Sequence, residues 1–181
     1  MVYLEEATSV DLKAIKKLYK DAFPRLERKS FGLIKKKAAE GFSKILAVKD
    51  DGNFCGLMIT AAFDGVMLLD YFAVSKDMRG KFIGTQALKE FLRIFSNDYR
   101  IFLEIELPNG REDDIKLKRK RFYLKNDLKQ SGIEVTLFSV PMELLYYTEK
   151  VTFQEYHDLY RAVFGNIFAK KVRFIKQRED F

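Results

Sequence analysis

The amino-acid sequence predicts an α/β fold with a central mixed, mostly antiparallel sheet that is flanked by helices. Three strand-like runs, Lys44–Asp50, Asn53–Phe63 and Val66–Val74, are separated by Asp-Gly dipeptides, which favour tight turns between antiparallel strands. A helical pattern and a further strand-like run follow, and this β-α-β order requires a crossover connection. The meander and the crossover together indicate a mixed sheet with helices packed on its faces.

The segment before the meander predicts a strand and two helices. Residues 2–6 alternate as a short strand, and Thr8 or Ser9 is placed to cap the helix that follows, which Pro24 ends. A second, shorter helix is predicted over residues 31–40, just before a glycine. The apolar face of the first helix carries Leu12, Ile15, Leu18 and Tyr19.

The segment after the meander adds three helices and three strands. The run of residues 99–108 is predicted as a strand with Phe102, Glu104 and Glu106 on one face. A helix over residues 112–128 has Ile115, Phe122 and Leu128 among its candidate buried residues. Two closing strands follow. The apolar face of the crossover helix carries Leu88, Phe91, Leu92 and Phe95, and that of the last helix carries Phe153, Tyr156, Tyr160, Phe164 and Ile167.

Composition sets the class of protein. The 181 residues, 48% of them hydrophobic, suffice for one well-packed core. The N-terminus carries charges near every apolar position, no window approaches the roughly 18 apolar residues of a membrane helix, and Cys55 is a single cysteine. We therefore expect a soluble cytoplasmic protein. The formal charge of +7 admits nucleic acid, an anionic surface or a phosphate-rich small molecule as a partner, and it is equally typical of a solvated surface.

The joint between the third strand-like run and the crossover helix carries candidate anion-binding groups. It reads Lys-Asp-Met-Arg-Gly-Lys-Phe-Ile-Gly-Thr over residues 76–85. A helix N-terminus presents backbone N–H groups without internal partners, and glycines let an anion approach them. Arg79 adds charge, and Thr85 can cap the helix or donate to a phosphate oxygen. The same composition also occurs in ordinary loops.

Two motifs resemble those of the GNAT acetyltransferases. The family's acyl-CoA loop has Arg or Gln, two residues, Gly, one residue, then Gly or Ala, and the run from Arg79 to Gly84 matches at both ends. The stretch Arg-Phe-Tyr-Leu-Lys-Asn-Asp-Leu, residues 121–128, is similar to the family's aromatic helix followed by Lys-Asn-Gly-Phe. The resemblance and the element order cover residues 1–148. Residues 149–181 are then a C-terminal helical extension, packed on the same domain or on a dimer partner.

This sequence departs from the family pattern at three positions. Phe82 stands where the loop of the family has its middle glycine, and Asp127 and Leu128 replace Gly-Phe. A side chain at position 82 disfavours positive φ, at a cost on the order of 1 kcal/mol. Rotation of the loop so that Phe82 points into the core is the alternative that avoids crowding of the cofactor. The departure bears on cofactor affinity more than on the fold.

The resemblance implies that acetyl-CoA is the acetyl donor and lies between two parallel strands, Met67–Val74 and Ile101–Leu107, that separate from each other. Backbone amides at the end of the first strand would bind the pantetheine and polarise the thioester carbonyl, on which negative charge grows in the transition state. The basic helix would supply part of the contact with the 3′-phosphate. The implied cofactor-binding residues are Phe72, Ala73, Val74, Arg79, Gly80, Lys81, Phe82, Ile83, Gly84, Thr85, Asn109 and Lys125.

Direct transfer to an amine requires a base, because an alkylamine must lose a proton before it attacks. Glu106 is the first candidate, Glu104 the second, and Asp70 on the neighbouring strand the third; a half-exposed strand face explains such carboxylates equally well. Tyr123 matches the family's proton donor to the leaving thiolate. Packing in the core is its alternative role.

The predicted function is acetylation of a primary amine of a small molecule, recognised in part by Arg25, Glu27 and Arg28. The alternatives are a protein N-acetyltransferase and an impaired GNAT-fold module that binds nucleic acid through its basic surface. The densest basic run, residues 116–125, lies in an amphipathic helix and favours a solvated face, so we do not expect nucleic acid or membrane partners. No metal site is predicted, because His157 is a lone histidine. A homodimer is expected.

Overall fold

A computed structural model describes residues 1–108, 110–111 and 114–177, except for the side chain of Leu26. It confirms the predicted α/β class and element order and adds one short helix and one strand at the end. The elements are β1 (Val2–Glu6), α1 (Asp11–Ala22), α2 (Phe31–Ala39), β2 (Ile45–Asp50), β3 (Asn53–Phe63), β4 (Val66–Val74), α3 (Ile83–Phe95), β5 (Arg100–Glu106), α4 (Ile115–Leu124), β6 (Lys129–Leu137), β7 (Val140–Tyr146), α5 (Phe153–Phe164), α6 (Asn166–Ala169) and β8 (Val172–Gln177).

The strands form one mixed sheet with the order β1-β2-β3-β4-β5-β7-β6-β8. The pairs β1–β2, β2–β3, β5–β7, β6–β7 and β6–β8 are antiparallel. β4 and β5 pair in parallel through Val66↔Arg100, Met67↔Ile101 and Leu68↔Phe102, near the start of both strands. The parallel pair confirms the predicted crossover, which α3 makes.

The hairpin turns of the meander have the backbone that their Asp-Gly sequences predict. Asp51 and Gly52 have φ of 47° and 81°, and Asp64 and Gly65 have φ of 49° and 74°. Positive φ at both central residues defines a type I′ turn, whose twist matches that of antiparallel strands. The two turns therefore fix the register of β2, β3 and β4.

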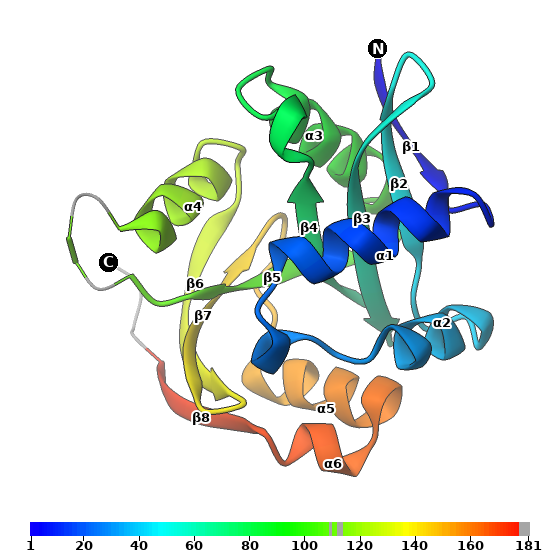
Figure 1. Cartoon of the computed structure of the whole chain (residues 1–181). Helices are drawn as coiled ribbons and strands as arrows, with labels where there is room; N and C mark the ends of the chain where they lie inside the picture. The colour runs from blue at the N-terminus through cyan, green and yellow to red at the C-terminus, as the bar shows by residue number, and fades with distance from the viewer. Residues whose placement is uncertain (109, 112–113, 178–181) are drawn as a thin grey trace. The chain divides into compact units, whose positions relative to one another are not determined.

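The chain divides into two compact units. The first comprises Met1–Ala61 and Leu69–Phe95. Its α1 crosses in front of β2 and β3 in Figure 1. The core between α1, α2 and strands β2, β3 and β4 consists of Ile15, Tyr19, Ile34, Ile45, Ala47, Leu57, Ile59, Tyr71 and Ala73. Gly56 allows β3 and β4 to pack closely, because an added Cβ would lie 2.5 Å from the Ala73 carbonyl oxygen.

The second unit comprises Ala62–Leu68 and Ser96–Phe181. Within it α5 packs against β5, where the rings of Phe102 and Tyr156 meet edge to face at 5.8 Å. β8 pairs with β6 in the register Val135↔Phe174 and Leu137↔Val172. The C-terminal segment thus contributes both a packed helix and an edge strand to this unit, and β8 was not predicted.

Three local predictions are wrong in detail. The side chain of Ile115 is 70% exposed, because α4 begins there after an Asp114 cap whose carboxylate accepts from the Lys116 N–H at 2.9 Å. The last long helix ends at Phe164, so Ile167 lies in α6 and is exposed. Leu128 is buried but follows α4 rather than belonging to it. No described helix is long and apolar enough to cross a membrane.

Candidate functional site

The loop between β4 and α3 forms the first part of the candidate site and belongs to the first unit. A short 3-10 turn, Lys76–Met78, leads into it, and Gly80 has a φ of 78°. Arg79 links the loop to the end of β4, because its Nε donates a hydrogen bond to the Val74 carbonyl at 3.1 Å. The terminal guanidinium nitrogens of Arg79 have no partner among the described residues. The loop therefore holds a positive charge at the start of α3.

The first turn of α3 presents backbone donors. The Gln86 N–H donates to the Phe82 carbonyl at 3.0 Å, at the N-terminal end of the helix. Within the described chain, the N–H groups of Ile83, Gly84 and Thr85 have no acceptor. Such orphan donors carry the positive end of the helix dipole and suit an anion. The loop and the first turn of α3 thus combine a positive charge with backbone donors.

Phe82 lies in this loop with an unusual backbone and an exposed ring. Its φ is 59°, in the left-handed region, and its side chain is 77% exposed. The ring therefore does not point into the core, which was the arrangement expected to remove crowding. Because the ring buries little surface, packing does not offset the cost of the left-handed backbone, about 1 kcal/mol for an L-residue. Lys81 is also exposed, with its Nζ 3.8 Å from the Met78 sulfur.

The other predicted cofactor contacts lie in three places. Ala73 is buried at the end of β4, and Phe72 and Val74 beside it are half-buried. The N–H of the following residue, Ser75, donates to the Cys55 carbonyl at 2.8 Å. Lys125 is exposed at the C-terminus of α4, in the second unit. Asn109 lies outside the described residues.

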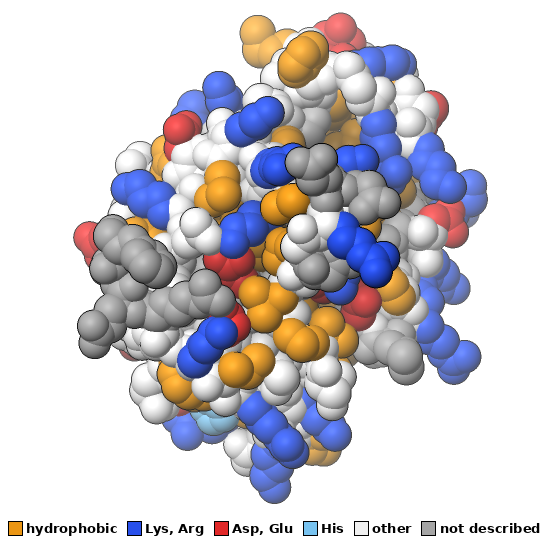
Figure 2. All heavy atoms as spheres, turned by 90° about the vertical axis from the view of Figure 1, so that its left-hand side faces the viewer, with side chains coloured by type: hydrophobic (Ala, Val, Ile, Leu, Met, Phe, Trp, Pro, Cys, Tyr) orange, Lys and Arg blue, Asp and Glu red, His pale blue; other side chains and the backbone are white. Residues whose placement is uncertain are grey.

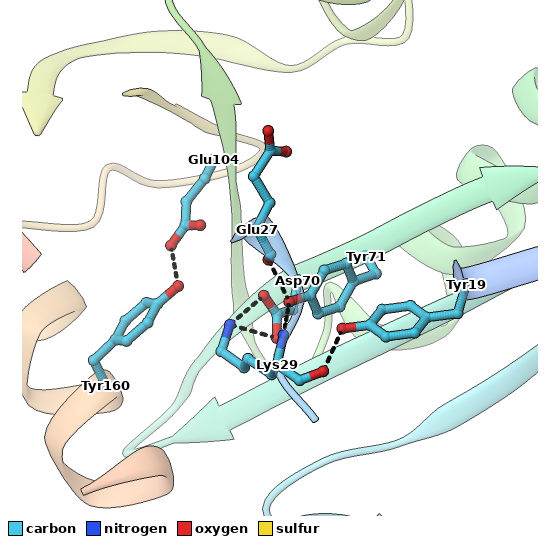
Figure 3. Close-up of polar contacts among 7 residues, drawn as sticks. All are labelled: Tyr19, Glu27, Lys29, Asp70, Tyr71, Glu104 and Tyr160. Carbon is cyan, nitrogen blue, oxygen red and sulfur yellow. Dashed lines mark hydrogen bonds and ion pairs between the residues drawn. The ribbon is translucent and has the colours of Figure 1, made fainter. Parts of the chain in front are cut away.

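A buried polar network anchors the segment between α1 and α2 in the first unit (Figure 3). The Lys29 Nζ lies 2.8 and 3.0 Å from the two carboxylate oxygens of Asp70, and both side chains are nearly inaccessible, at 2% and 4%. The Tyr71 hydroxyl accepts from the Lys29 N–H and donates to the Glu27 carbonyl, each at 3.1 Å. The Tyr19 hydroxyl donates to the Lys29 carbonyl at 3.0 Å.

Asp70 is thus committed to an ion pair. Burial raises its pKa and the neighbouring Lys29 ammonium opposes that rise. Burial also raises the pKa of Tyr19, which keeps its hydroxyl a donor at neutral pH. Nearby, the buried Nε of Arg28 has no hydrogen-bond partner among the described residues. The network fixes the backbone of residues 27–29 beside this unsatisfied donor.

The two carboxylates of β5 lie in the second unit and have different partners. Both Glu106 oxygens are occupied by cations of α4: Lys116 Nζ lies 2.6 Å from Oε2, and Arg119 lies 3.5 Å from Oε1. Glu104 accepts a 2.7 Å hydrogen bond from the hydroxyl of Tyr160, a fully buried residue of α5 (Figure 3). A strand with period two places both carboxylates on one face; the helices make them chemically different.

Tyr123 is buried in α4, with its ring 5.2 Å from that of Phe122. Burial raises its pKa to about 12, against the lowering effect of Arg119. Tyr123 is therefore protonated at neutral pH and able to donate. The next turn follows the resembling motif: the Asn126 amide donates to the Phe122 carbonyl at 2.8 Å, and Asp127 has a φ of 68° at the glycine position of the family pattern.

The basic run of α4 is only partly unpaired. Lys116 and Arg119 contact Glu106, and the Lys120 Nζ lies 2.7 Å from Glu143. On the face shown in Figure 2, lysine and arginine side chains are dispersed among hydrophobic and acidic ones. Dispersed, partly neutralised charge is typical of a solvated surface rather than of a phosphate-tracking groove.

Sequence reasoning missed Lys29 and Tyr160. Lys29 was one of several charges near Pro24, and no local pattern distinguishes a lysine that becomes buried. Tyr160 was identified only as part of an apolar helical face. A hydroxyl on such a face is the available signal, because a buried tyrosine usually finds a hydrogen-bond partner.

Known proteins resemble this chain in sequence and in fold. YjbC of Bacillus subtilis (strain 168), which is named as an acetyltransferase, is 32% identical over 114 residues, and the alignment spans 59% of this chain and only 57% of that relative's length. A GNAT-family structure from Bacteroides thetaiotaomicron has a TM-score of 0.75 at 19% identity, with 90% of this chain and 98% of that chain covered. A GNAT acetyltransferase from Elizabethkingia anophelis, with acetyl-CoA bound, has a TM-score of 0.59 at 15% identity and coverage of 81% and 97%. Residues 12–115 match the sequence profile of the acetyltransferase (GNAT) family, and the chain belongs to that family.

Proposed function

We propose that this protein is an acetyl-CoA-dependent N-acetyltransferase that transfers an acetyl group directly to a primary amine of a small molecule. The observation that carries the proposal is the loop before α3, in which Arg79 and the N–H groups of Ile83, Gly84 and Thr85 lack partners within the described chain. In a GNAT-family chain this loop has the right position and chemistry for a pyrophosphate.

The donor would be held by charge and by backbone hydrogen bonds. When bound, acetyl-CoA supplies the acetyl group and a thiolate leaving group. The orphan N–H groups of α3 pair with phosphate oxygens without any rearrangement of the helix, and Arg79 adds a charge-assisted contact. The ring of Phe82 is 77% exposed, so packing in the core does not hold it in place.

Proton transfers fall to residues of the second unit. The amine must lose a proton as it forms the new C–N bond, and the breaking C–S bond leaves a thiolate that gains one. We assign the base to Glu104, whose carboxylate accepts the hydrogen bond of the Tyr160 hydroxyl; both oxygens of Glu106 lie against cations of α4. We assign the proton donor to Tyr123, because it stands at the position of that residue in the family motif and its phenol is protonated at neutral pH.

The acceptor is proposed to be a small amine that also carries an anionic group. The unsatisfied Arg28 Nε, beside backbone that Tyr19 and Tyr71 hold in place, is the donor that such a group would satisfy. A protein N-terminus or lysine remains the alternative acceptor. Nucleic acid is disfavoured by the ion pairs that neutralise much of α4. The homodimer stays a prediction.

Calorimetric titration with acetyl-CoA tests the donor site. We expect binding in the micromolar range that weakens about tenfold in Arg79→Ala, which corresponds to loss of about 1.4 kcal/mol. The matched control is Arg93→Ala, which removes an equally exposed charge from the other end of α3, where Arg93 pairs with Glu90. An amine screen that detects released thiol, with small amines and peptides in separate arms, then identifies the acceptor class.

Absence of binding by both the native protein and Phe82→Gly would contradict the proposal. Binding of acetyl-CoA by Phe82→Gly but not by the native protein would show a GNAT fold that has lost acetyl-CoA binding. That result would also contradict the proposal. Equal weakening in Arg79→Ala and Arg93→Ala would mean that net charge, rather than the loop, attracts the ligand.

A further inference from the structure

α5 contacts β5 at three successive points in the second unit. Arg100, the first residue of β5, pairs with Glu155 in the first turn of α5. Phe102 meets the Tyr156 ring at 5.8 Å, and Glu104 accepts from the Tyr160 hydroxyl at 2.7 Å. Arg100 and Phe102 thus meet neighbouring residues in the first turn of the helix, and Glu104 meets the residue one turn further on.

Two residues of the strand and four residues of the helix span similar lengths, which explains why the second and third contacts follow one another. Alternate residues of a strand are about 6.7 Å apart, and four residues of a helix rise about 6.0 Å. Tyr160 follows Tyr156 by four residues, and Glu104 follows Phe102 by two. The packing of Tyr156 on Phe102 therefore places the Tyr160 hydroxyl beside the Glu104 carboxylate.

Tyr160 is held firmly. Its side chain has no exposed surface, and its ring lies between those of Tyr156, at 5.2 Å, and Phe164, at 5.4 Å. The start of α5 is fixed as well, because Thr152 and Glu155 form a reciprocal capping box and Glu155 also pairs with Arg100. The Tyr160 hydroxyl therefore contacts Glu104 from a fixed position.

We propose that Tyr160 is a positioning residue for the catalytic base Glu104, supplied by a helix outside the family-matched residues 12–115. This inference rests on the proposed function. Since Tyr160 is fully buried, it does not touch the substrate; it acts through Glu104. A phenol that donates to a carboxylate favours the ionised form, so Tyr160 keeps Glu104 deprotonated and correctly oriented to accept the amine proton.

The test compares Tyr160→Phe with Tyr156→Phe, which removes a hydroxyl of equal burial one turn away on the same helix. We expect the kcat of Tyr160→Phe to fall about tenfold at neutral pH, in line with the loss of one hydrogen bond to a charged group, with KM for acetyl-CoA unchanged. The acid limb of its kcat/KM profile should move to higher pH. In a Glu104→Gln background, Tyr160→Phe should change kcat little, because both changes affect one base.

A readout without turnover separates this inference from the proposed function. Carbon-13 NMR of the Glu104 carboxyl, assigned with Glu104→Gln, follows its titration in the free protein. A midpoint that moves to higher pH in Tyr160→Phe and not in Tyr156→Phe supports the positioning role. An unchanged midpoint, or an equal change in both variants, overturns it. If Glu104→Gln retains full activity towards an accepted amine, Glu104 is not the base and the inference fails, whereas transferase activity itself stands.

Discussion

Removal of the Lys29 ammonium should destabilise the protein far more than removal of an exposed lysine. The Lys29 Nζ lies 2.8 and 3.0 Å from the Asp70 oxygens, and the two side chains are 2% and 4% exposed. Lys29→Met keeps the length and apolar stem of the side chain, and it leaves the Asp70 carboxylate buried without its cation.

The burial of the pair sets the magnitude. Loss of one partner from a buried ion pair costs about 3–5 kcal/mol, because the remaining charge loses its compensation. The control is Lys44→Met, since Lys44 pairs with Glu6 at 2.7 Å while both side chains are substantially exposed, at 40% and 73%. Exposed pairs contribute about 0–1 kcal/mol. The double variant Lys29→Met/Asp70→Leu should lose less than the sum of the two single variants.

Urea unfolding at pH 7 and at acidic pH provides the assay. Burial raises the pKa of Asp70 above its ordinary value of 3.8, and loss of Lys29 removes the opposing effect. A folded state with a raised carboxyl pKa is favoured at low pH and loses stability as the pH rises through that pKa. The cost of Lys29→Met should therefore be full at pH 7 and smaller near pH 4. A cost below 1 kcal/mol at pH 7, or single-variant costs that simply add, would refute the reasoning.

Two further predictions concern the second unit. Arg100 lowers the pKa of Glu155 below its ordinary value of 4.5, so its contribution is present above pH 4.5 and is lost as the pH falls through the lowered pKa. As the pH falls through that window, the free energy of unfolding of the native protein, measured with urea, should decrease relative to that of Glu155→Gln. The decrease should be under about 1 kcal/mol, because the side chains of Arg100 and Glu155 are about one third exposed. Tyr123→Phe should lower kcat about a hundredfold, measured by thiol release, and leave the acetyl-CoA dissociation constant unchanged. An unaltered kcat would leave Tyr123 as a core residue.

Local chemistry explains which parts of the fold were predictable. The Asp-Gly turns require positive φ at both residues, and the structure has it at Asp51 and Gly52. Each strand of the meander was found because a tight turn and an alternating pattern are properties of neighbouring residues. β8 was not predicted, because its identity comes from pairing with β6, as in Leu137↔Val172, and that pairing is not visible in the local sequence.

Periodicity also failed where a helix boundary depends on a cap. Ile115 falls on the apolar spacing of the predicted helix, yet it is the first residue of α4 and faces solvent. The Asp114 carboxylate caps the helix one residue earlier. A spacing rule describes a helix interior and says little about where its first turn lies.

In the candidate site, too, local features were predictable from the sequence and long-range contacts were not. The loop at Arg79 was predicted because its residues are contiguous and its chemistry follows from a helix N-terminus. The partners of Glu104 and Asp70 come from segments 56 and 41 residues away, and periodicity predicts only that Tyr160 is buried, not what its hydroxyl contacts. Long-range polar pairs of this kind are settled by packing, so they required the structure.

Two of the departures from the family pattern adopt the left-handed backbone region that glycine tolerates best. Phe82 and Asp127 both stand at glycine positions of the resembling motifs, and both adopt positive φ, 59° and 68°. Aspartate tolerates this region better than phenylalanine, because its short side chain bonds locally to the backbone. Phe82 adopts the left-handed conformation although its exposed ring gains little from packing. The geometry of the loop therefore outweighs the preference of phenylalanine for negative φ.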